Sequence, residues 1–192
     1  PATRSSSSAA SDVYKRQLAS LVMTVKHVSL DTGRQLAGKS AITVPDQRWD
    51  RRDIKTIQLL PNCLAKQAAS EKGAYEAIMV MPDGSVSEGS SSNVWILNNE
   101  NQLITRIPDE DILNGITRQS IQRIAGERQM EIVERSFSVA EMMQAKEVFV
   151  TSATSMVTAL THIDGKKIDE GKVGLIASAL KADYIKYVET CS

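Results

Sequence analysis

Short apolar segments rich in β-branched residues alternate with helix-forming segments along most of this 192-residue chain, and this alternation constrains the fold more than any other feature. Strands are predicted over residues 21–30, 40–44, 75–81, 94–97, 103–106, 131–137, 146–150 and 156–163. Helices are predicted over residues 62–73, from 116 onward, from 138 onward and over 172–189. The sequence has no repeat of fixed period. The pattern predicts an α+β fold with strands in hairpins and helices packed outside.

Turn and cap residues predict several element boundaries. Asn62 is expected to cap the first of these helices and Gly73 to end it, at the position where glycine tolerates a positive φ. Residues 82–84, Pro-Asp-Gly, predict a turn, and the residues NNENQ predict a hairpin between the strands on either side. Ser138 with Glu141 three residues later forms the pattern of a capping box.

Composition excludes several classes of function. Lys plus Arg and Asp plus Glu each number 23, so the formal net charge is zero, which argues against a broadly basic nucleic-acid surface. Two histidines and two cysteines are too few for a zinc finger or a histidine-rich metal centre, and we predict no metal. No run approaches the roughly 20 apolar residues of a membrane-spanning helix. Two cysteines without a disulfide framework are typical of cytosolic thiols, so we expect a soluble cytoplasmic protein without membrane partners.

The first 17 residues, PATRSSSSAASDVYKRQ, contain four consecutive serines and no periodic apolar face. They also lack the apolar core of a signal peptide. We interpret residues 1–17 as a disordered or non-native tail and expect the folded part to begin near Leu18.

Lys55 is the first candidate for chemistry. It is flanked by Ile54 and Ile57 in a stretch that is apolar at alternate positions, where a charged ammonium would be poorly solvated. Desolvation favours the neutral amine, the form that attacks a carbonyl and makes a Schiff base. The alternative is a lysine that points to solvent, as most lysines in strand-like segments do. For the neighbouring Arg52 and Asp53, a solvated ion pair is expected.

The second candidate is the motif SEGSSSN, residues 87–93, between two predicted strands. Glu88, Gly89 and three serines form a tight turn dense in hydrogen-bonding groups, and such a turn can aim an acid into a pocket. The alternative is a solvated hairpin loop.

Two further motifs offer hydrogen-bond donors to an anion. In LNGITR, residues 113–118, Gly115 precedes a predicted helix start, where unpaired N–H groups and the helix dipole favour phosphate. In TSATS, residues 151–155, hydroxyl groups follow a strand and can add donors to the same anion. Taken singly, each motif also has a purely structural explanation.

Together these motifs resemble the class IV aminotransferases that use pyridoxal phosphate, and within them the D-amino-acid aminotransferases. The resemblance extends from about Ile42 to Tyr187 and includes DQRWDRRDIKTIQLLPNCLAKQAA, GAYEAIMV, DGSVSEGSSSNVWI, ILNGITRQS, FVTSATS and IDGKKI in the order of the family. It implies the C-terminal large domain of that fold, with a mixed, barrel-like sheet surrounded by helices.

The resemblance also implies roles for residues of this chain. Lys55 would hold pyridoxal phosphate as a Schiff base and shuttle the α-proton of the substrate, Glu88 would pair with the pyridine nitrogen, and Leu113 would lie against the cofactor ring. Phosphate contacts are implied for Gly115, Ile116, Thr117, Ser152, Ala153 and Thr154. Substrate contacts are implied for Ser91, Ser92 and Thr154. A carboxylate that keeps the pyridine nitrogen protonated makes the ring an electron sink, which fits the role of Glu88.

The implied reaction exchanges the amino group of a D-amino acid, such as D-alanine, with a 2-oxo acid, such as 2-oxoglutarate. An aminodeoxychorismate lyase, which shares the lysine and the acid, is the main alternative. A branched-chain aminotransferase is disfavoured because that group carries Gly-Asn-Tyr after the lysine, whereas residues 56–60 read TIQLL. A catalytically inactive α+β module is the non-enzymatic alternative.

The resemblance implies two features of the whole protein. Family members form homodimers, and they carry a smaller N-terminal domain of roughly a hundred residues, a usual domain size. Most of that domain has no counterpart here. We therefore expect residues 18–192 to form the pyridoxal-phosphate-binding domain of an N-terminally truncated chain whose own activity is in question.

Overall fold

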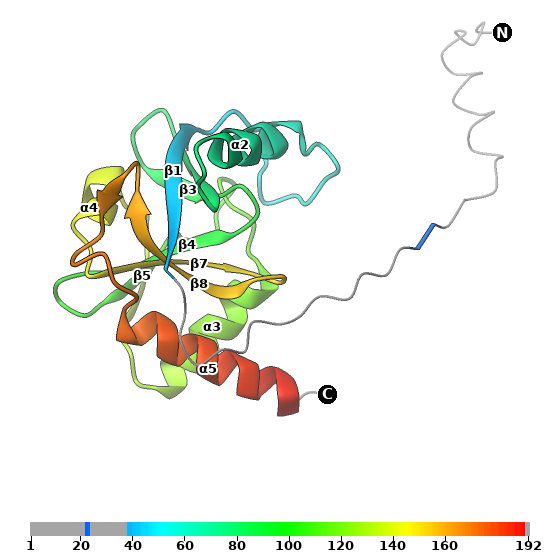
Figure 1. The fold of residues 1–192 in the computed structure, drawn as a ribbon. Coiled ribbons are helices and arrows are strands. Elements are labelled where there is room, and N and C mark those ends of the chain that lie inside the picture. The colour runs from blue at the N-terminus through cyan, green and yellow to red at the C-terminus, as the bar shows by residue number, and fades with distance from the viewer. Residues whose placement is uncertain (1–21, 24–37, 191–192) are drawn as a thin grey trace, which may run out of the picture. The chain divides into compact units, whose positions relative to one another are not determined.

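The structure, a computed structural model, describes residues 22–23 and 38–190 (Figure 1). Its strands are β1 (Lys39–Pro45), β2 (Glu76–Val80), β3 (Val86–Gly89), β4 (Asn93–Leu97), β5 (Leu103–Thr105), β6 (Ile132–Glu134), β7 (Glu147–Ser152), β8 (Met156–Ile163) and β9 (Lys166–Lys167). Its helices are α2 (Leu60–Glu71), α3 (Ile116–Glu127), α4 (Val139–Met143) and α5 (Leu175–Thr190). The predicted tail of residues 1–17 and, apart from residues 22–23, the predicted strand over residues 21–30 lie outside the described residues.

One mixed sheet joins these strands in the order β3-β2-β1-β8-β7-β4-β5-β6, with β9 paired to β8. The predicted hairpin of β4 and β5 is confirmed, and the predicted strands β7 and β8 are also antiparallel neighbours. The hairpin of β2 and β3 was not predicted, because β3 is not among the predicted strands. The expectation of hairpins throughout is wrong for β1, because β1 runs parallel to both of its neighbours, β2 and β8. Parallel neighbours require a crossover connection, so no local turn sequence could predict this pairing.

The two ends of the strand order meet. Ser85 forms an isolated bridge with Ser138, and the N–H of Val86 donates to the carbonyl of Phe137 at 2.9 Å. The sheet therefore curls round on itself, as Figure 1 shows. The predicted barrel-like core is confirmed.

Side chains alternate between the inside and the outside of the curled sheet because successive residues of a strand face opposite ways. The inner core combines residues of β1 to β8 with Phe137 and with Met142 of α4. The outer face of β4 and β7 presents Trp95 and Phe149, whose stacked rings lie 5.8 Å apart and which α3 and α5 cover. Ala65 and Ala69 of α2 cover the outer face of β1 and β2. Figure 1 shows α2 on one side of the sheet and α3 and α5 on the other.

Local signals predicted most helix boundaries, but α5 begins at Leu175 and not at residue 172. Gly73 has the predicted positive φ, 67°, just after α2. The prediction that Asn62 caps α2 is wrong: the helix begins at Leu60, where Pro61 fits the first turn, and Asn62 instead donates to the carbonyl of Ser90 at 2.8 Å.

The predicted starts of α3 and α4 are confirmed, because Gly115 directly precedes α3 and Ser138 precedes α4. The Ser138 hydroxyl accepts the N–H of Glu141 at 3.1 Å. The Glu141 carboxylate accepts hydrogen bonds from Arg135. Within the described part of the chain, no helix is long and apolar enough to cross a membrane.

Candidate active site

A cavity of about 510 Å³ lies between four segments of the chain: residues 48–62, 88–93, 113–117 and 151–153. They belong to the loop between β1 and α2, the turn between β3 and β4, the start of α3 and the turn between β7 and β8. The predicted site residues that line this cavity are Lys55, Glu88, Ser91, Ser92, Leu113, Gly115, Ile116, Thr117, Ser152 and Ala153. The remaining predicted site residue, Thr154, is exposed and does not line it. The fold thus gathers motifs that lie about a hundred residues apart.

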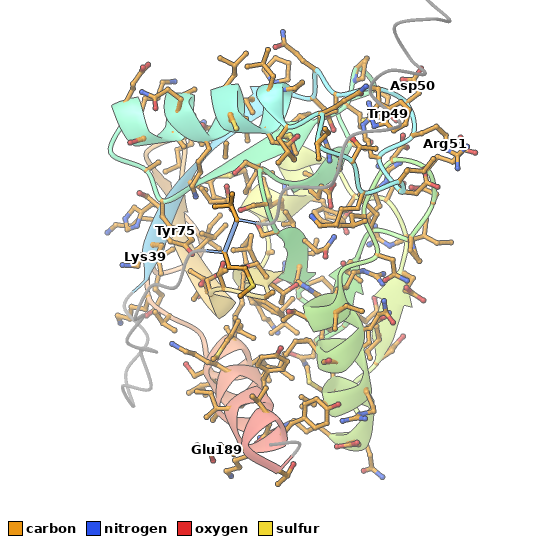
Figure 2. All side chains as sticks on the ribbon, turned by 90° about the vertical axis from the view of Figure 1, so that its right-hand side faces the viewer. Lys39, Trp49, Asp50, Arg51, Tyr75 and Glu189 are labelled. Carbon is orange, nitrogen blue, oxygen red and sulfur yellow. The ribbon has the colours of Figure 1, made fainter. Side chains whose placement is uncertain are left out.

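The loop of residues 46–59 supplies one wall of the cavity and forms no strand. Figure 2 shows Trp49 and Arg51 of this loop together at an outer edge. There, Nη2 of Arg51 pairs with Oδ2 of Asp53 at 2.8 Å. The expected solvated ion pair at Asp53 therefore exists, but its partner is Arg51 and not Arg52.

Lys55 lies on this loop, and its surroundings differ from the prediction. The side chain is exposed, and its neighbours Ile54 and Ile57 are 44% and 97% exposed. The prediction that the Lys55 amine is desolvated within an apolar strand is therefore wrong. The loop forms no strand, and its apolar side chains Ile54 and Ile57 are exposed and do not surround Lys55. Lys55 nevertheless lines the cavity.

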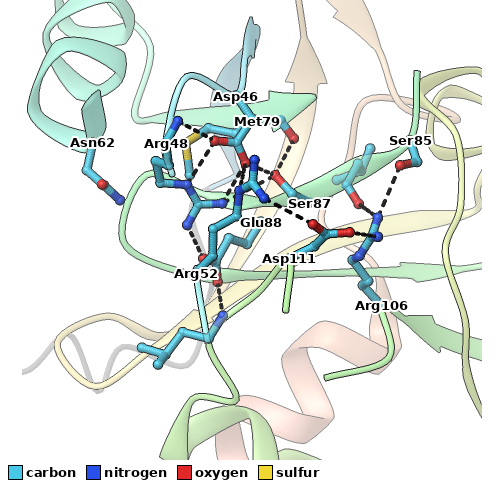
Figure 3. Close-up of polar contacts among 12 residues, drawn as sticks. Asp46, Arg48, Arg52, Asn62, Met79, Ser85, Ser87, Glu88, Arg106 and Asp111 are labelled. Carbon is cyan, nitrogen blue, oxygen red and sulfur yellow. Dashed lines mark hydrogen bonds and ion pairs between the residues drawn. The ribbon is translucent and has the colours of Figure 1, made fainter. Parts of the chain in front are cut away.

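Glu88, at the end of β3, is the buried acid of the cavity. Its Oε1 accepts a hydrogen bond from Nη1 of Arg48. Its Oε2 accepts from Nδ2 of Asn93 at 3.1 Å and from the N–H of Leu113 at 3.2 Å. Figure 3 shows Arg48 and Glu88 facing each other within a larger group of polar contacts. Three segments of the chain therefore fix the position of this carboxylate: the loop before α2, the turn between β3 and β4, and the residues before α3.

Burial raises the pKa of Glu88 from 4.5 to about 7. The charge of Arg48, its hydrogen bond and the N–H of Leu113 act in the opposite direction, while the nearby charge of Asp46 adds to the increase. Glu88 is therefore an acid that gains or loses its proton near neutral pH, and a cationic group placed beside it would favour the charged form.

A cluster of buried ions next to Glu88 was missed by sequence reasoning. Oδ2 of Asp46 lies 2.7 Å from Nη2 of Arg48 and 3.2 Å from Nε of Arg52. Nη1 of Arg52 also pairs with Asp111 at 3.0 Å, as Figure 3 shows. Charged loop residues are usually exposed, so the segment DQRWDRRD gave no sign that two arginines and an aspartate would be buried. Arg48 and Arg52 line the cavity, whereas Asp46 does not line it and pairs with both arginines.

Asn93 joins Glu88 to the start of α3. Its Nδ2 donates both to Glu88 and, at 2.8 Å, to the carbonyl of Leu113. Its Oδ1 lies so close to Gly115 that a Cβ there would be only 2.5 Å away. Gly115 has an ordinary φ of −63°, so this close approach, and not backbone conformation, is the reason for glycine.

The start of α3 and the turn after β7 can hold an anion. The first N–H groups of a helix have no partner within the helix, and the helix dipole is positive at that end. In α3 they belong to Ile116 and Thr117, which line the cavity. Opposite, Ser152 and Ala153 also line it, although the Ser152 hydroxyl bonds to the Ser155 hydroxyl at 2.7 Å.

Comparisons with known proteins agree with this arrangement. The sequence profile of the family described as Amino-transferase class IV matches residues 2–163. The chain is 43% identical over 140 residues to a D-alanine aminotransferase of Bacillus licheniformis, and this alignment covers 73% of this chain and 49% of that protein. It is 38% identical over 168 residues to a D-alanine aminotransferase of Listeria innocua, which covers 88% and 57% respectively.

A solved structure of a branched-chain aminotransferase from Thermoproteus uzoniensis superposes with a TM-score of 0.68 at 28% identity, covering 80% of this chain and 52% of that one. The chain spans about half the length of the curated relatives it matches. The profile match, the identities and the shared fold lead to one conclusion: this chain belongs to the class IV aminotransferase family.

Proposed function

We propose that this chain supplies the cofactor-binding part of a pyridoxal-phosphate-dependent aminotransferase that exchanges the amino group of a D-amino acid with a 2-oxo acid. The observation that carries the proposal is one cavity lined by Lys55, by the buried Glu88 and by the first turn of α3. The relatives named D-alanine aminotransferase support the substrate class.

The groups that line the cavity fit pyridoxal phosphate. Lys55 offers an amine for an aldehyde, and Glu88 offers a buried acid that a protonated ring nitrogen would keep charged. The N–H groups of Ile116 and Thr117 suit a phosphate dianion. When bound, the cofactor supplies an aldehyde carbon that takes up the amino group and a ring that withdraws electrons from the substrate.

The residues of the chain then have separate tasks. Lys55 Nζ, as a free amine, would take the proton from the α-carbon of the substrate and donate it to the carbon that carried the aldehyde, so it would act first as a base and then as an acid. Glu88 holds a proton at the ring nitrogen. The start of α3 and the turn at Ser152 and Ala153 hold the phosphate, which keeps the ring aligned with Lys55.

A branched-chain amino acid is the second candidate substrate, because the solved structure with the TM-score of 0.68 is named a branched-chain aminotransferase. The higher identity to proteins named D-alanine aminotransferase favours the D-amino acid. Amino-group transfer from D-alanine and from L-leucine to 2-oxoglutarate, measured side by side, distinguishes the two.

We also propose that two copies of the chain associate. Ile57, Leu60 and Leu64, close to the cavity, are 97%, 69% and 55% exposed. Neighbouring apolar side chains exposed to this degree are typical of an interaction surface. We also propose a cytoplasmic location. The free thiol of Cys63, among the described residues, supports this proposal.

The test of this function is the absorbance of the purified chain mixed with pyridoxal phosphate. We expect a band near the visible edge, which Lys55→Ala abolishes because the amine is gone. Lys172→Ala is the matched control, since Lys172 is exposed and pairs with Glu170 outside the cavity. An equal band in Lys55→Ala and in the unchanged chain would overturn the assignment.

A further inference from the structure

A further buried acid, Glu76, lies behind the turn between β3 and β4 and has no task in the proposed chemistry. It is the first residue of β2 and is only 2% exposed. It does not line the cavity. A buried carboxylate is costly unless hydrogen bonds or opposite charges compensate it, so its partners indicate why it is there.

Both carboxylate oxygens of Glu76 have partners in the turn. Oε1 accepts the hydroxyl of Ser90, and Oε2 accepts the hydroxyl of Ser92 at 2.9 Å. Oε1 also accepts the N–H of Ala77 at 2.9 Å and lies 3.5 Å from the ammonium of Lys66. Four groups therefore contact this carboxylate, three of them at Oε1 and one at Oε2.

The turn is also packed against this carboxylate. A Cβ at Gly89 would lie 3.3 Å from Cδ of Glu76 and would overlap the hydroxyl of Ser92. The backbone of Ser90 is held from two sides, because its N–H donates to Ala77 at 2.9 Å and its carbonyl accepts Nδ2 of Asn62 at 2.8 Å. The turn therefore has little freedom while these contacts hold.

The three serines consequently differ in what they offer the cavity. The hydroxyl protons of Ser90 and Ser92 are donated to Glu76. Ser91 is exposed, lines the cavity and makes no side-chain hydrogen bond with any described residue. The predicted substrate contacts at Ser91 and Ser92 are thus not equivalent, since only the Ser91 hydroxyl retains its proton for a ligand.

We propose that Glu76 is a positioning residue that holds the Gly89–Ser92 turn, and through it Glu88 and Asn93 on either side, in the geometry that binds the cofactor. Glu88 directly precedes the turn and Asn93 directly follows it, and the two are joined by a hydrogen bond of 3.1 Å. If the turn moves, the bond between Asn93 and Glu88 lengthens and the Glu88 carboxylate loses its fixed orientation in the cavity. The part of the inference that concerns the cofactor rests on the proposed function.

The first measurement needs no cofactor. In Glu76→Gln, one carboxylate oxygen becomes an amide N–H₂ that faces existing donors. We expect hydrogen exchange at the N–H groups of Gly89 and Ser90 to quicken by about tenfold or more, since a hydrogen bond to a charged group is worth at least that factor. Exchange in the β4–β7 ladder reports global unfolding and serves as the internal reference. Unchanged exchange in the turn relative to that reference would overturn the proposal.

Two matched variants accompany it. Ser91→Ala changes the same turn without touching Glu76, so turn exchange should stay as in the unchanged chain. Glu147→Gln removes a carboxylate that accepts two backbone N–H groups at the start of α5, at 3.0 and 2.9 Å, far from the turn in the sequence and in contact with none of it. It should also leave exchange in the turn unaltered. Faster turn exchange in either control equal to that in Glu76→Gln would contradict a specific role of Glu76.

The second measurement is a thermodynamic cycle on pyridoxal phosphate affinity. We expect Ser92→Ala to weaken binding by roughly tenfold and Glu76→Gln by at least as much, because Glu76 also accepts the hydroxyl of Ser90. The double variant should weaken binding no further than Glu76→Gln, since the contact with Ser92 is then already lost. Fully additive losses would refute action through Ser92. If the unchanged chain binds no pyridoxal phosphate, the proposed function fails, while the exchange measurement still decides whether Glu76 holds the turn.

Discussion

Replacing Glu88 by glutamine tests the central electrostatic feature of the cavity. Burial raises the pKa of Glu88 from 4.5 to about 7 in the folded chain. Between these two values the folded state keeps a proton that the unfolded state has released. Because stability falls with rising pH wherever the folded state binds more protons, the free energy of unfolding should decrease from about pH 4.5 to about pH 7. At about 1.4 kcal/mol per pKa unit, the full decrease is about 3 kcal/mol.

The assay is urea unfolding at several pH values from about pH 5 to about pH 8. Glu88→Gln cannot titrate, so its unfolding free energy should fall by about 3 kcal/mol less than that of the unchanged chain across this range. The ion pair with Arg48 is also lost, but it forms only when Glu88 is charged, so its pH dependence is already contained in the pKa of Glu88. Arg48 has a raised pKa, and although burial opposes it, hydrogen bonds from Arg48 and Ser87 lower the pKa of Asp46, so neither group titrates in the range.

Glu134→Gln is the control, because a hydrogen bond from Arg118 lowers the pKa of Glu134 and its titration falls below the range. It should leave the pH dependence unchanged. Parallel curves for Glu88→Gln and the unchanged chain would refute the raised pKa of Glu88. With saturating pyridoxal phosphate, the difference between them should shrink if the ring nitrogen keeps Glu88 charged.

Three further substitutions have defined outcomes. Gly115→Ala places a Cβ 2.5 Å from Oδ1 of Asn93, so pyridoxal phosphate affinity, measured by absorbance titration, should fall. An affinity equal to that of the unchanged chain would contradict the close approach. Trp95→Ala removes a fully buried ring and should cost about 3–5 kcal/mol in urea unfolding; a loss below about 1 kcal/mol would be inconsistent with that burial. Ser138→Ala removes the cap of α4 and should cost about 1 kcal/mol, whereas no loss would mean that the cap is unimportant.

Elements whose signals lie within a few residues were predicted well. The turn at residues 82–84, Gly73 after α2, Ser138 before α4 and the hairpin of β4 and β5 all depend on local backbone preferences, which a sequence displays directly. The pairing of β1 was not predictable in this way. Its Thr43 bonds to Asp164, 121 residues away, and no local pattern encodes such a contact.

The loop of residues 46–59 shows the opposite error. Its alternating apolar residues are typical of a strand, yet Ile57 is almost fully exposed and Lys55 is exposed as well. Alternation predicts a strand only where a sheet edge is available to pair with it. Conversely, the charges of Arg48 and Arg52 suggest a solvated loop, but tertiary contacts bury them against Asp46.

The order of the residues established which chemical groups the chain carries: an amine at Lys55, an acid in SEGSSSN and a helix start in LNGITR. Those contiguous motifs sufficed to indicate the family. The partner that each group receives became visible only in the folded chain, where Glu88 pairs with Arg48 and Glu76 accepts hydrogen bonds from the hydroxyl groups of Ser90 and Ser92. Burial and ion pairing depend on residues distant in sequence, so local patterns could not predict them. In this chain they set the pKa of Glu88 and the orientation of Glu88 and Glu76.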